Sequence, residues 1–324
     1  MIYGLLRWFT GIALHWFYSG IEVTGRGKIP ETGPVILAAS HHNALVDALI
    51  AGWIAPRRVT LTAKATLLDN PLTAWLFPIV GIVPLRRAKD EIQKPDNGEH
   101  KPDRNAGAFD SILRILEKGE MVLIFPEGIS HSFPHLAPLK TGAARLALEA
   151  RDQRHIANLQ IIPLGLNFED KGNPGTAVLV ETGEPILMDR VGNVTVKELT
   201  DVIAERLAAV SLKMPEPSSD RDSVKRKGVA RPLASPLAAW GELTHRYIIN
   251  YARDIALRKS KSPDDPAMNT IVLSLVLILL SYAVQFAIIC ALAGPWWAAL
   301  FTATLPLGAY WAAYKNHPES GTAL

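Results

Sequence analysis

The stretch "PVILAASHHNALVDALIAGWIA" (residues 34–55) changes its pattern half-way along. Residues 34–40 are a short, nearly continuous apolar run, which is typical of a strand buried on both faces of a sheet. Residues 44–55 are long enough for a helix, and Asn43 in front of them is a favoured N-cap residue. The stretch therefore predicts a strand, a short loop and a helix in succession.

Between residues 21 and 214 the same alternation repeats. Five more apolar runs predict strands, at residues 58–64, 81–85, 121–125, 161–168 and 176–182. Further helical stretches fall at residues 106–118, 140–151 and 196–212. This order predicts an α/β domain with a mixed, largely parallel sheet flanked by helices. The polar interval 86–105 has no apolar period, so we expect a mobile surface loop there.

The first twenty residues are apolar and aromatic, but Arg7 lies inside the run. A signal peptide would carry its charge before the apolar core. We therefore expect a helix at a membrane interface, with Trp8, Trp16 and Tyr18 near the lipid headgroups. A helix packed against the body of the domain is the alternative.

The other end of the chain predicts a second membrane element. A linker and a helix at residues 215–268 precede residues 271–293, which carry no formal charge and could span a bilayer core of about 30 Å. With residues 296–314 they predict a transmembrane hairpin at residues 269–315; two buried helices of a soluble core are the alternative, although such helices normally show a polar stripe. Basic residues flank the hairpin on both sides, so the positive-inside rule places the α/β domain on the cytoplasmic face.

Composition excludes several classes of protein. The chain has 324 residues and a formal net charge of +3, which indicates no particular partner. Its single cysteine, Cys290, excludes a disulfide framework and a cysteine-based metal site. Neither a Gly-x-Gly-x-x-Gly nor a Walker A motif occurs, and only the short basic stretch at residues 221–231 could favour nucleic acid. We therefore expect no metal, no cofactor and no nucleic-acid partner.

Within residues 34–55, His42 and Asp47 form a possible base and its orienting carboxylate. Residues five apart within one helix point away from each other, so the two can meet only if His42 lies in the loop and the helix begins near Asn43. A neutral imidazole can take a proton from an attacking hydroxyl, and a carboxylate fixes its tautomer. The sequence thus predicts a general base at His42, with His41 as the rival.

Three other predicted strands end in, or contain, unusual residues. "MVLIFPEGISHS" (residues 121–132) breaks into Glu127 and Gly128, and "GIVPLRR" (residues 81–87) ends in two arginines. "IIPLGLNF" (residues 161–168) holds Pro163, which is tolerated only at a sheet edge or a bulge.

Together these segments resemble the glycerophospholipid acyltransferase family over about residues 25–185. The family's four blocks fall in order on His42 and Asp47, on Gly81 and Arg87, on Phe125, Pro126, Glu127 and Gly128, and on Pro163. Four ordered blocks are far more specific than any one of them. The sequence departs from the family in two places: His41 stands where Asn is common, and Ile129-Ser130-His131 stands where Thr-Arg often follows.

The resemblance implies a membrane-bound enzyme of phospholipid biosynthesis. It would move a fatty acyl group from acyl-CoA or acyl-carrier protein to a hydroxyl of glycerol 3-phosphate or of a lysophospholipid such as 1-acylglycerol 3-phosphate. His42 would be the general base, and Arg87 would hold the phosphate, with Arg86 as its competitor. Glu127 would hydrogen-bond the acceptor or stabilise a turn.

The resemblance also implies which side chains surround the substrate. Gly128, Phe125, Pro126 and Pro163 complete the predicted substrate site, whereas His131 and Lys140 are expected to be structural. Two other classes stay open: a membrane-bound thioesterase or other hydrolase, disfavoured because no Gly-x-Ser-x-Gly elbow occurs, and a non-catalytic lipid-binding protein on the same fold.

Overall fold

The computed structural model describes residues 2–18, 20–64, 82–85, 106–133, 135–172, 176–211, 236–259 and 265–314. The predicted loop at residues 86–105, the predicted linker at residues 215–220, and Gly81, Arg86 and Arg87 lie outside these ranges. The elements are α1 (Ile2–Phe17), β1 (Gly20–Thr24), β2 (Val35–Ala39), α2 (Ala44–Ile54), β3 (Val59–Lys64), β4 (Ile82–Leu85), α4 (Ala106–Glu117), β5 (Met121–Ile124), α5 (Gly142–Asp152), β6 (Gln160–Phe168), β7 (Ala177–Thr182), β8 (Ile186–Leu187), α6 (Val196–Ala208), α8 (Pro236–Lys259), α9 (Asp265–Ala293) and α10 (Pro295–Tyr314).

The strands form one sheet in the order β1-β7-β6-β2-β5-β3-β4, with β8 paired to β6. Its pairs are parallel except for β6 with β7 and β6 with β8. The prediction of a mixed, largely parallel sheet is confirmed, and all six predicted strands are present. Two strands were missed: β8 is only two residues long, and no residue of β1 is fully buried.

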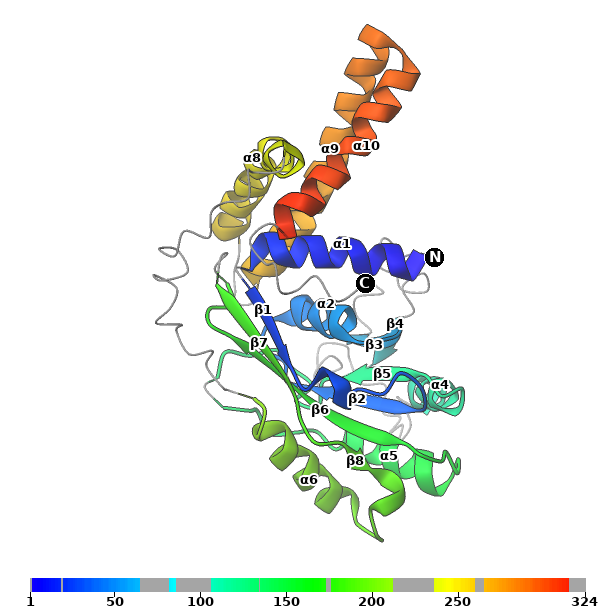
Figure 1. Ribbon diagram of the computed structural model, residues 1–324. Coiled ribbons are helices and arrows are strands. Elements are labelled where there is room, and N and C mark those ends of the chain that lie inside the picture. Colours follow the sequence, from blue (N-terminus) through cyan, green and yellow to red (C-terminus); the bar gives the residue numbers. More distant parts are fainter. Residues whose placement is uncertain are drawn as a thin grey trace, which may run out of the picture.

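Helices cover both faces of the sheet (Figure 1). Side chains of β2 alternate between two apolar cores, because successive residues of a strand point to opposite faces. Val35, Leu37 and Ala39 pack with α1 and α2, whereas Ile36 and Ala38 pack with α4, α5 and α6. All five are fully buried, which explains why the strand reads as an unbroken apolar run.

Pro163 lies in the interior of the sheet, so of the two expected positions, a sheet edge or a bulge, the edge is wrong. The strand β6 pairs with β8 up to Ile161 and with β7 from Leu164, which leaves a gap beside Pro163. There the Pro163 carbonyl accepts a hydrogen bond from Gly183 in the turn between β7 and β8 (2.9 Å). The missing N–H therefore faces a break between two strands, where no ladder bond is lost.

The N-terminal helix α1 both packs on the domain and exposes apolar side chains. Leu14 and Phe17 are buried in the core shared with α2, whereas Leu5, Leu6 and Phe9 are exposed. The expected position of Tyr18 near lipid headgroups is wrong, because its side chain is buried in the same core. The alternative of a packed helix thus holds for the end of α1 that precedes the sheet.

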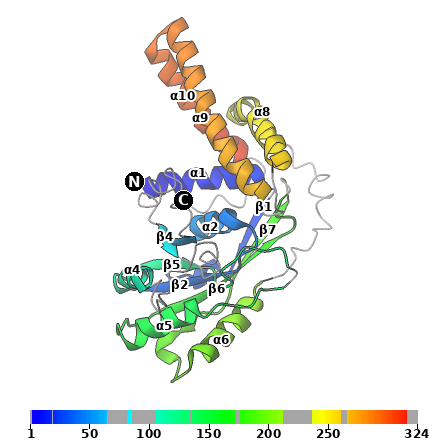
Figure 2. The same ribbon diagram turned by 180° about the vertical axis from the view of Figure 1, so that it is seen from behind.

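The helices α9 and α10 run side by side away from the sheet, and α8 packs against both (Figure 2). Among the helices that the structure describes, one is long and apolar enough to cross a bilayer, namely Pro266–Ala293 in α9, with a mean hydropathy of 2.6. The residues of the predicted second span form the helix α10, which is less apolar, so its role as a span stays a prediction. Gly241 and Gly308 allow α8 and α10 to touch, since a Cβ on Gly241 would lie 1.9 Å from the Gly308 carbonyl oxygen.

Candidate functional site

The candidate site lies where β2 and β5 end. Because these strands are parallel neighbours, with Ala38 opposite Ile124, the loops that follow them start at the same edge of the sheet. Ser40 fixes the first loop to β6: its backbone N–H donates to the Leu164 carbonyl (3.0 Å), and its hydroxyl accepts from the Leu166 N–H (2.9 Å). The loop after β2 is therefore held to the sheet at its first residue.

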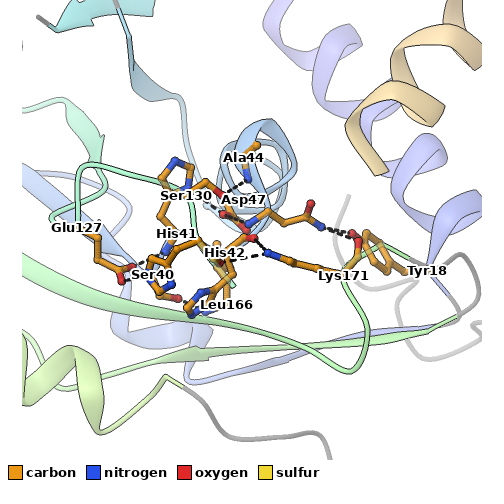
Figure 3. A network of polar contacts seen from close by, with 12 residues as sticks. Tyr18, Ser40, His41, His42, Ala44, Asp47, Glu127, Ser130, Leu166 and Lys171 are labelled. Carbon is orange, nitrogen blue, oxygen red and sulfur yellow. Dashed lines mark hydrogen bonds and ion pairs between the residues drawn. The ribbon is translucent and has the colours of Figure 1, made fainter. Parts of the chain in front are cut away.

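Asp47 is paired with His41, and not with His42 as the sequence prediction had it. The Nδ1 atom of His41 lies 2.9 Å from Asp47 Oδ2 (Figure 3). The same oxygen accepts a hydrogen bond from the Asn43 backbone N–H at 2.7 Å. The predicted helix start after Asn43 and the predicted direction of Asp47, back toward the loop, are both confirmed.

Adjacent residues in an extended loop point in different directions, so only one of two consecutive histidines can face Asp47. His41 takes that direction because its own backbone N–H is bonded to the Glu127 carboxylate at 2.8 Å. The sequence places both histidines within reach of Asp47 but does not contain this long-range bond, so it could not decide between them.

The contacts of His41 fix its tautomer. Asp47 Oδ2 can only accept, so Nδ1 of His41 carries the proton of the neutral ring and Nε2 holds a lone pair. The ring stacks on Phe125, with centroids 4.0 Å apart, and its side chain stays 10% exposed. In the part of the chain that the structure describes, Nε2 forms no hydrogen bond. His41 Nε2 therefore has a free lone pair, as a general base requires.

His42 has a different environment. Its side chain is buried and meets the ring of His131 edge to face, with centroids 4.9 Å apart. Its Nε2 atom is buried with no hydrogen-bond partner among the described residues. Burial lowers the pKa of His42 below its ordinary value, and the neighbouring charge of Asp47 opposes that shift. His42 therefore favours a neutral, uncharged ring.

The loop after β5 begins with a tight turn. The Gly128 N–H donates to the Phe125 carbonyl at 3.0 Å, with Pro126 and Glu127 as the central residues. Proline suits the first central position, and Gly128 adopts a φ of 72°, which glycine accepts without strain. The segment Phe125-Pro126-Glu127-Gly128 thus forms a β-turn. The turn directs the Glu127 carboxylate toward the loop after β2, which carries His41 and His42.

The Glu127 carboxylate is fully occupied by protein donors. Its Oε1 accepts from the His41 N–H, and its Oε2 accepts from the Ala137 N–H (2.7 Å) and from His131 Nε2. The residue is only 1% exposed. This geometry favours the structural reading of Glu127, which positions His41, over a direct bond to an acceptor hydroxyl.

Both ring nitrogens of His131 also form hydrogen bonds within the protein. Its Nδ1 accepts the Phe133 N–H at 3.2 Å, so Nε2 carries the proton that it donates to Glu127. Its backbone N–H donates to the His41 carbonyl at 3.2 Å. The structural role expected for His131 fits these contacts. Lys140 is exposed, and its backbone N–H donates to the Pro126 carbonyl at 2.7 Å.

Lys171 and Tyr18 belong to this network, although sequence reasoning missed both. The Lys171 ammonium donates to the carbonyls of His42 (2.7 Å) and His131 (3.2 Å), so it joins the two loops. Tyr18 accepts a hydrogen bond from the Asn43 side chain at 2.9 Å. Neither residue lies in a motif, and no local signal in the sequence marks them.

Ala44 adds a strained position at the start of α2. Its φ of 45° is left-handed, which is uncommon for a residue with a Cβ. The Ser130 hydroxyl accepts its N–H at 3.1 Å and so helps to hold it there. Strain of this kind is concentrated at functional sites.

The other predicted site residues lie apart from the network. Pro163 is buried beside Ala38, and the network reaches β6 only at Leu164 and Leu166. Its contact with substrate stays a prediction, as does that of Arg87, which lies outside the described residues.

Residues 20–167 match the family model described as Acyltransferase. The chain is similar to glycerol-3-phosphate O-acyltransferase 2 of Saccharomyces cerevisiae, with 28% identity over 75% of this chain and 32% of the yeast protein. It is also similar to a chloroplast 1-acyl-sn-glycerol-3-phosphate acyltransferase of Arabidopsis thaliana, with 21% identity over 59% of this chain and 46% of the plant protein. The chain spans less than half the length of either relative.

Among solved structures, the chain resembles the 1-acyl-sn-glycerophosphate acyltransferase PlsC from Thermotoga maritima. The TM-score is 0.49 and the identity 19%, over 64% of this chain and 77% of that one.

Proposed function

Since residues 20–167 belong to the Acyltransferase family, we propose that this protein is a membrane-bound O-acyltransferase of glycerolipid synthesis. It moves a fatty acyl group from acyl-CoA or acyl-carrier protein to a hydroxyl of a glycerol phosphate. The observation that carries the proposal is the Asp47–His41 pair, in which one ring nitrogen is fixed by the carboxylate and the other is left without a partner among the described residues.

His41 replaces His42 as the proposed general base. As the acceptor oxygen attacks the thioester carbonyl, Nε2 of His41 takes the hydroxyl proton, and Asp47 stabilises the imidazolium that forms. The tetrahedral intermediate then collapses, the C–S bond breaks, and the imidazolium returns the proton to the departing thiolate. The protons and electrons balance without any further reactant.

The buried Glu127 would act on this reaction indirectly. Its bond to the His41 N–H sets the direction of the histidine, and its bonds to Ala137 and His131 hold the loop after β5 in place. A base must lie within about 3 Å of the proton it abstracts, so small displacements of this backbone would slow the reaction.

The printed names of the two relatives support two acceptors, glycerol 3-phosphate and 1-acyl-sn-glycerol 3-phosphate. Both carry a phosphate monoester, which a guanidinium binds well with two parallel hydrogen bonds. We assign that contact to Arg87 from the sequence alone. Charge reversal at Arg87 should raise the KM for the acceptor while leaving the KM for the thioester unchanged.

Attachment to a membrane is supported by the surface of the C-terminal helices. Large apolar side chains of α9 and α10 are exposed, among them Val276, Leu280, Leu292, Trp296 and Trp297. A contiguous apolar surface of this kind on a helix of span length is stable in lipid and unfavourable in water. The basic residues on both sides of the hairpin support a site on the cytoplasmic face.

The proposal is tested by thiol release from palmitoyl-CoA with purified full-length protein. Glycerol 3-phosphate, 1-acylglycerol 3-phosphate and dihydroxyacetone phosphate are each supplied as acceptor. We expect release that depends on one of these acceptors, with an acylated product. Equal release without any acceptor would identify a thioesterase instead, and no release with any acceptor would indicate a non-catalytic lipid-binding protein.

A further inference from the structure

A cavity of about 490 Å³ lies between α1, α8, α9 and α10, outside the polar network of the site. Its lining is almost entirely apolar and includes Phe9 and Trp16 of α1 and Ile278 and Phe286 of α9. Protein interiors rarely leave voids larger than a water molecule, and this volume is typical of ligand sites. The cavity is therefore large enough to hold a ligand.

The cavity is elongated. Its lining residues on α9 recur at helical spacing along one face, from Thr270 to Phe286. At 1.5 Å per residue these positions extend over about 24 Å. A volume of about 490 Å³ spread over that length leaves room for an extended hydrocarbon chain. The shape favours an extended chain over a compact ligand.

The slot opens on the outer side of α9. Leu275 and Leu279 line it and yet are 50% and 55% exposed. Both lie within the segment Pro266–Ala293 that is long and apolar enough to span a bilayer. A chain dissolved in lipid could enter sideways here without crossing water.

Hydroxyl groups interrupt the apolar lining of the slot. Ser274 and Thr302 line it, and their hydroxyls are buried without a hydrogen-bond partner in the part of the chain that the structure describes. A buried hydroxyl without a partner is unfavourable.

The foot of the slot adjoins the histidine loop. Phe17 lines the slot, and the next residue, Tyr18, accepts the hydrogen bond from Asn43. Ile271, also in the lining, packs against the apolar core that contains Val46 of α2. The foot of the slot therefore borders the core that α1 and α2 share.

We propose that this slot holds the fatty acyl chain of the thioester donor. The chain lies along α9 between α1 and α10, with its carbonyl end toward the histidine loop. The identity of the donor rests on the proposed function, whereas occupancy of the slot can be tested without turnover.

The first test is photolabelling of full-length protein with the His41→Ala substitution, in phosphatidylcholine nanodiscs. The probe is palmitoyl-CoA with a photoreactive diazirine at the end of its chain. We expect labelled peptides from α9 and α10 and their loss when unlabelled palmitoyl-CoA is added. Labelling confined to residues 20–211, or labelling that unlabelled palmitoyl-CoA does not reduce, would overturn the proposal; the second result would indicate a membrane phospholipid in the slot.

The second test compares two bulky substitutions two residues apart on α9. Ile278→Trp fills the slot, whereas Leu280→Trp places the same ring on the exposed face, where Leu280 is 59% exposed. We expect Ile278→Trp to lower kcat/KM for palmitoyl-CoA relative to octanoyl-CoA at least tenfold, and Leu280→Trp to change that ratio less than twofold. Equal effects of the two would refute the slot. If the wild-type chain transfers no acyl group at all, the proposed function fails, and the labelling still reports on the slot.

Discussion

Two carboxylate–histidine pairs lie side by side in this protein, and they differ in how many of their hydrogen-bonding positions are filled. In the Glu127–His131 pair, both carboxylate oxygens and both ring nitrogens are bonded within the protein. In the Asp47–His41 pair, Asp47 Oδ1 is buried without a partner among the described residues, and His41 keeps one nitrogen unbonded there. The Glu127–His131 pair, whose hydrogen-bonding positions are filled, therefore has a structural role. The Asp47–His41 pair keeps a ring nitrogen that can accept a proton.

The largest difference between the pairs is expected from replacing the two carboxylates by amides. Asp47→Asn should lower kcat by about 10³-fold, because the amide no longer fixes the tautomer or stabilises the imidazolium. The amide oxygen can still accept the Asn43 N–H, so the thermal unfolding midpoint should change little. Steady-state thiol release and thermal unfolding in the same detergent measure the two quantities. A loss below tenfold would remove Asp47 from the mechanism.

Glu127→Gln should lower the stability of the protein more, and kcat less, than Asp47→Asn does. Its amide group would face the N–H of His41 or the donors of Ala137 and His131, which leaves a buried donor unpaired at a cost of about 1–3 kcal/mol. We expect a lower free energy of unfolding in urea and a fall in kcat of roughly tenfold. If Glu127→Gln instead abolished catalysis at unchanged stability, the two pairs would not differ in kind.

Lys171→Met should have a smaller effect. It removes the ammonium that joins the His42 and His131 carbonyls, and we expect kcat to fall several-fold, with a loss of about 1 kcal/mol in stability. The KM for the thioester should not change, because Lys171 positions the loops. Lys118→Met, in the exposed turn after α4, is the matched control and should leave both quantities at their wild-type values. Equal losses in the two variants would contradict the bridging role.

The smallest effect concerns pH and His42. Burial lowers the pKa of His42 in the folded protein, so the unfolded chain binds a proton first as the pH falls. The contribution of His42 to the free energy of unfolding should therefore be constant above about pH 6.5, the ordinary value for histidine, and should decrease below it. His42→Gln should make the dependence on pH between 7 and 5 shallower. An unchanged slope would show that His42 stays accessible to protons.

Most strands of the sheet could be predicted from the sequence. Apolar runs such as residues 34–40 and 121–125 located buried strands within one or two residues, because strands covered on both faces need continuous apolar side chains. It missed β1, whose residues are only partly buried. It also misjudged Pro163, because the gap between β7 and β8 that accommodates the proline depends on pairing between distant segments.

The sequence predicted which segments meet at the site, but it did not predict the individual contacts between their side chains. The positions of Asp47 and of the Phe125–Gly128 turn follow from strand ends, which local patterns reveal. Which histidine faces Asp47 depends on a hydrogen bond from residue 41 to Glu127, 86 residues away. Lys171 and Tyr18 reach the site from other elements, and Tyr18 was misplaced because an aromatic residue after an apolar helix suits a buried and an interfacial position equally.

The central claim is that the ring bonded to Asp47 is the base, and the ratio of two turnover numbers tests it most directly. Purified His41→Ala and His42→Ala proteins are compared in acyl transfer from palmitoyl-CoA, each first shown to unfold cooperatively. Our account predicts that His41→Ala retains at most one hundredth of the kcat of His42→Ala. The reverse order, with activity lost on replacing His42 and kept on replacing His41, would contradict it.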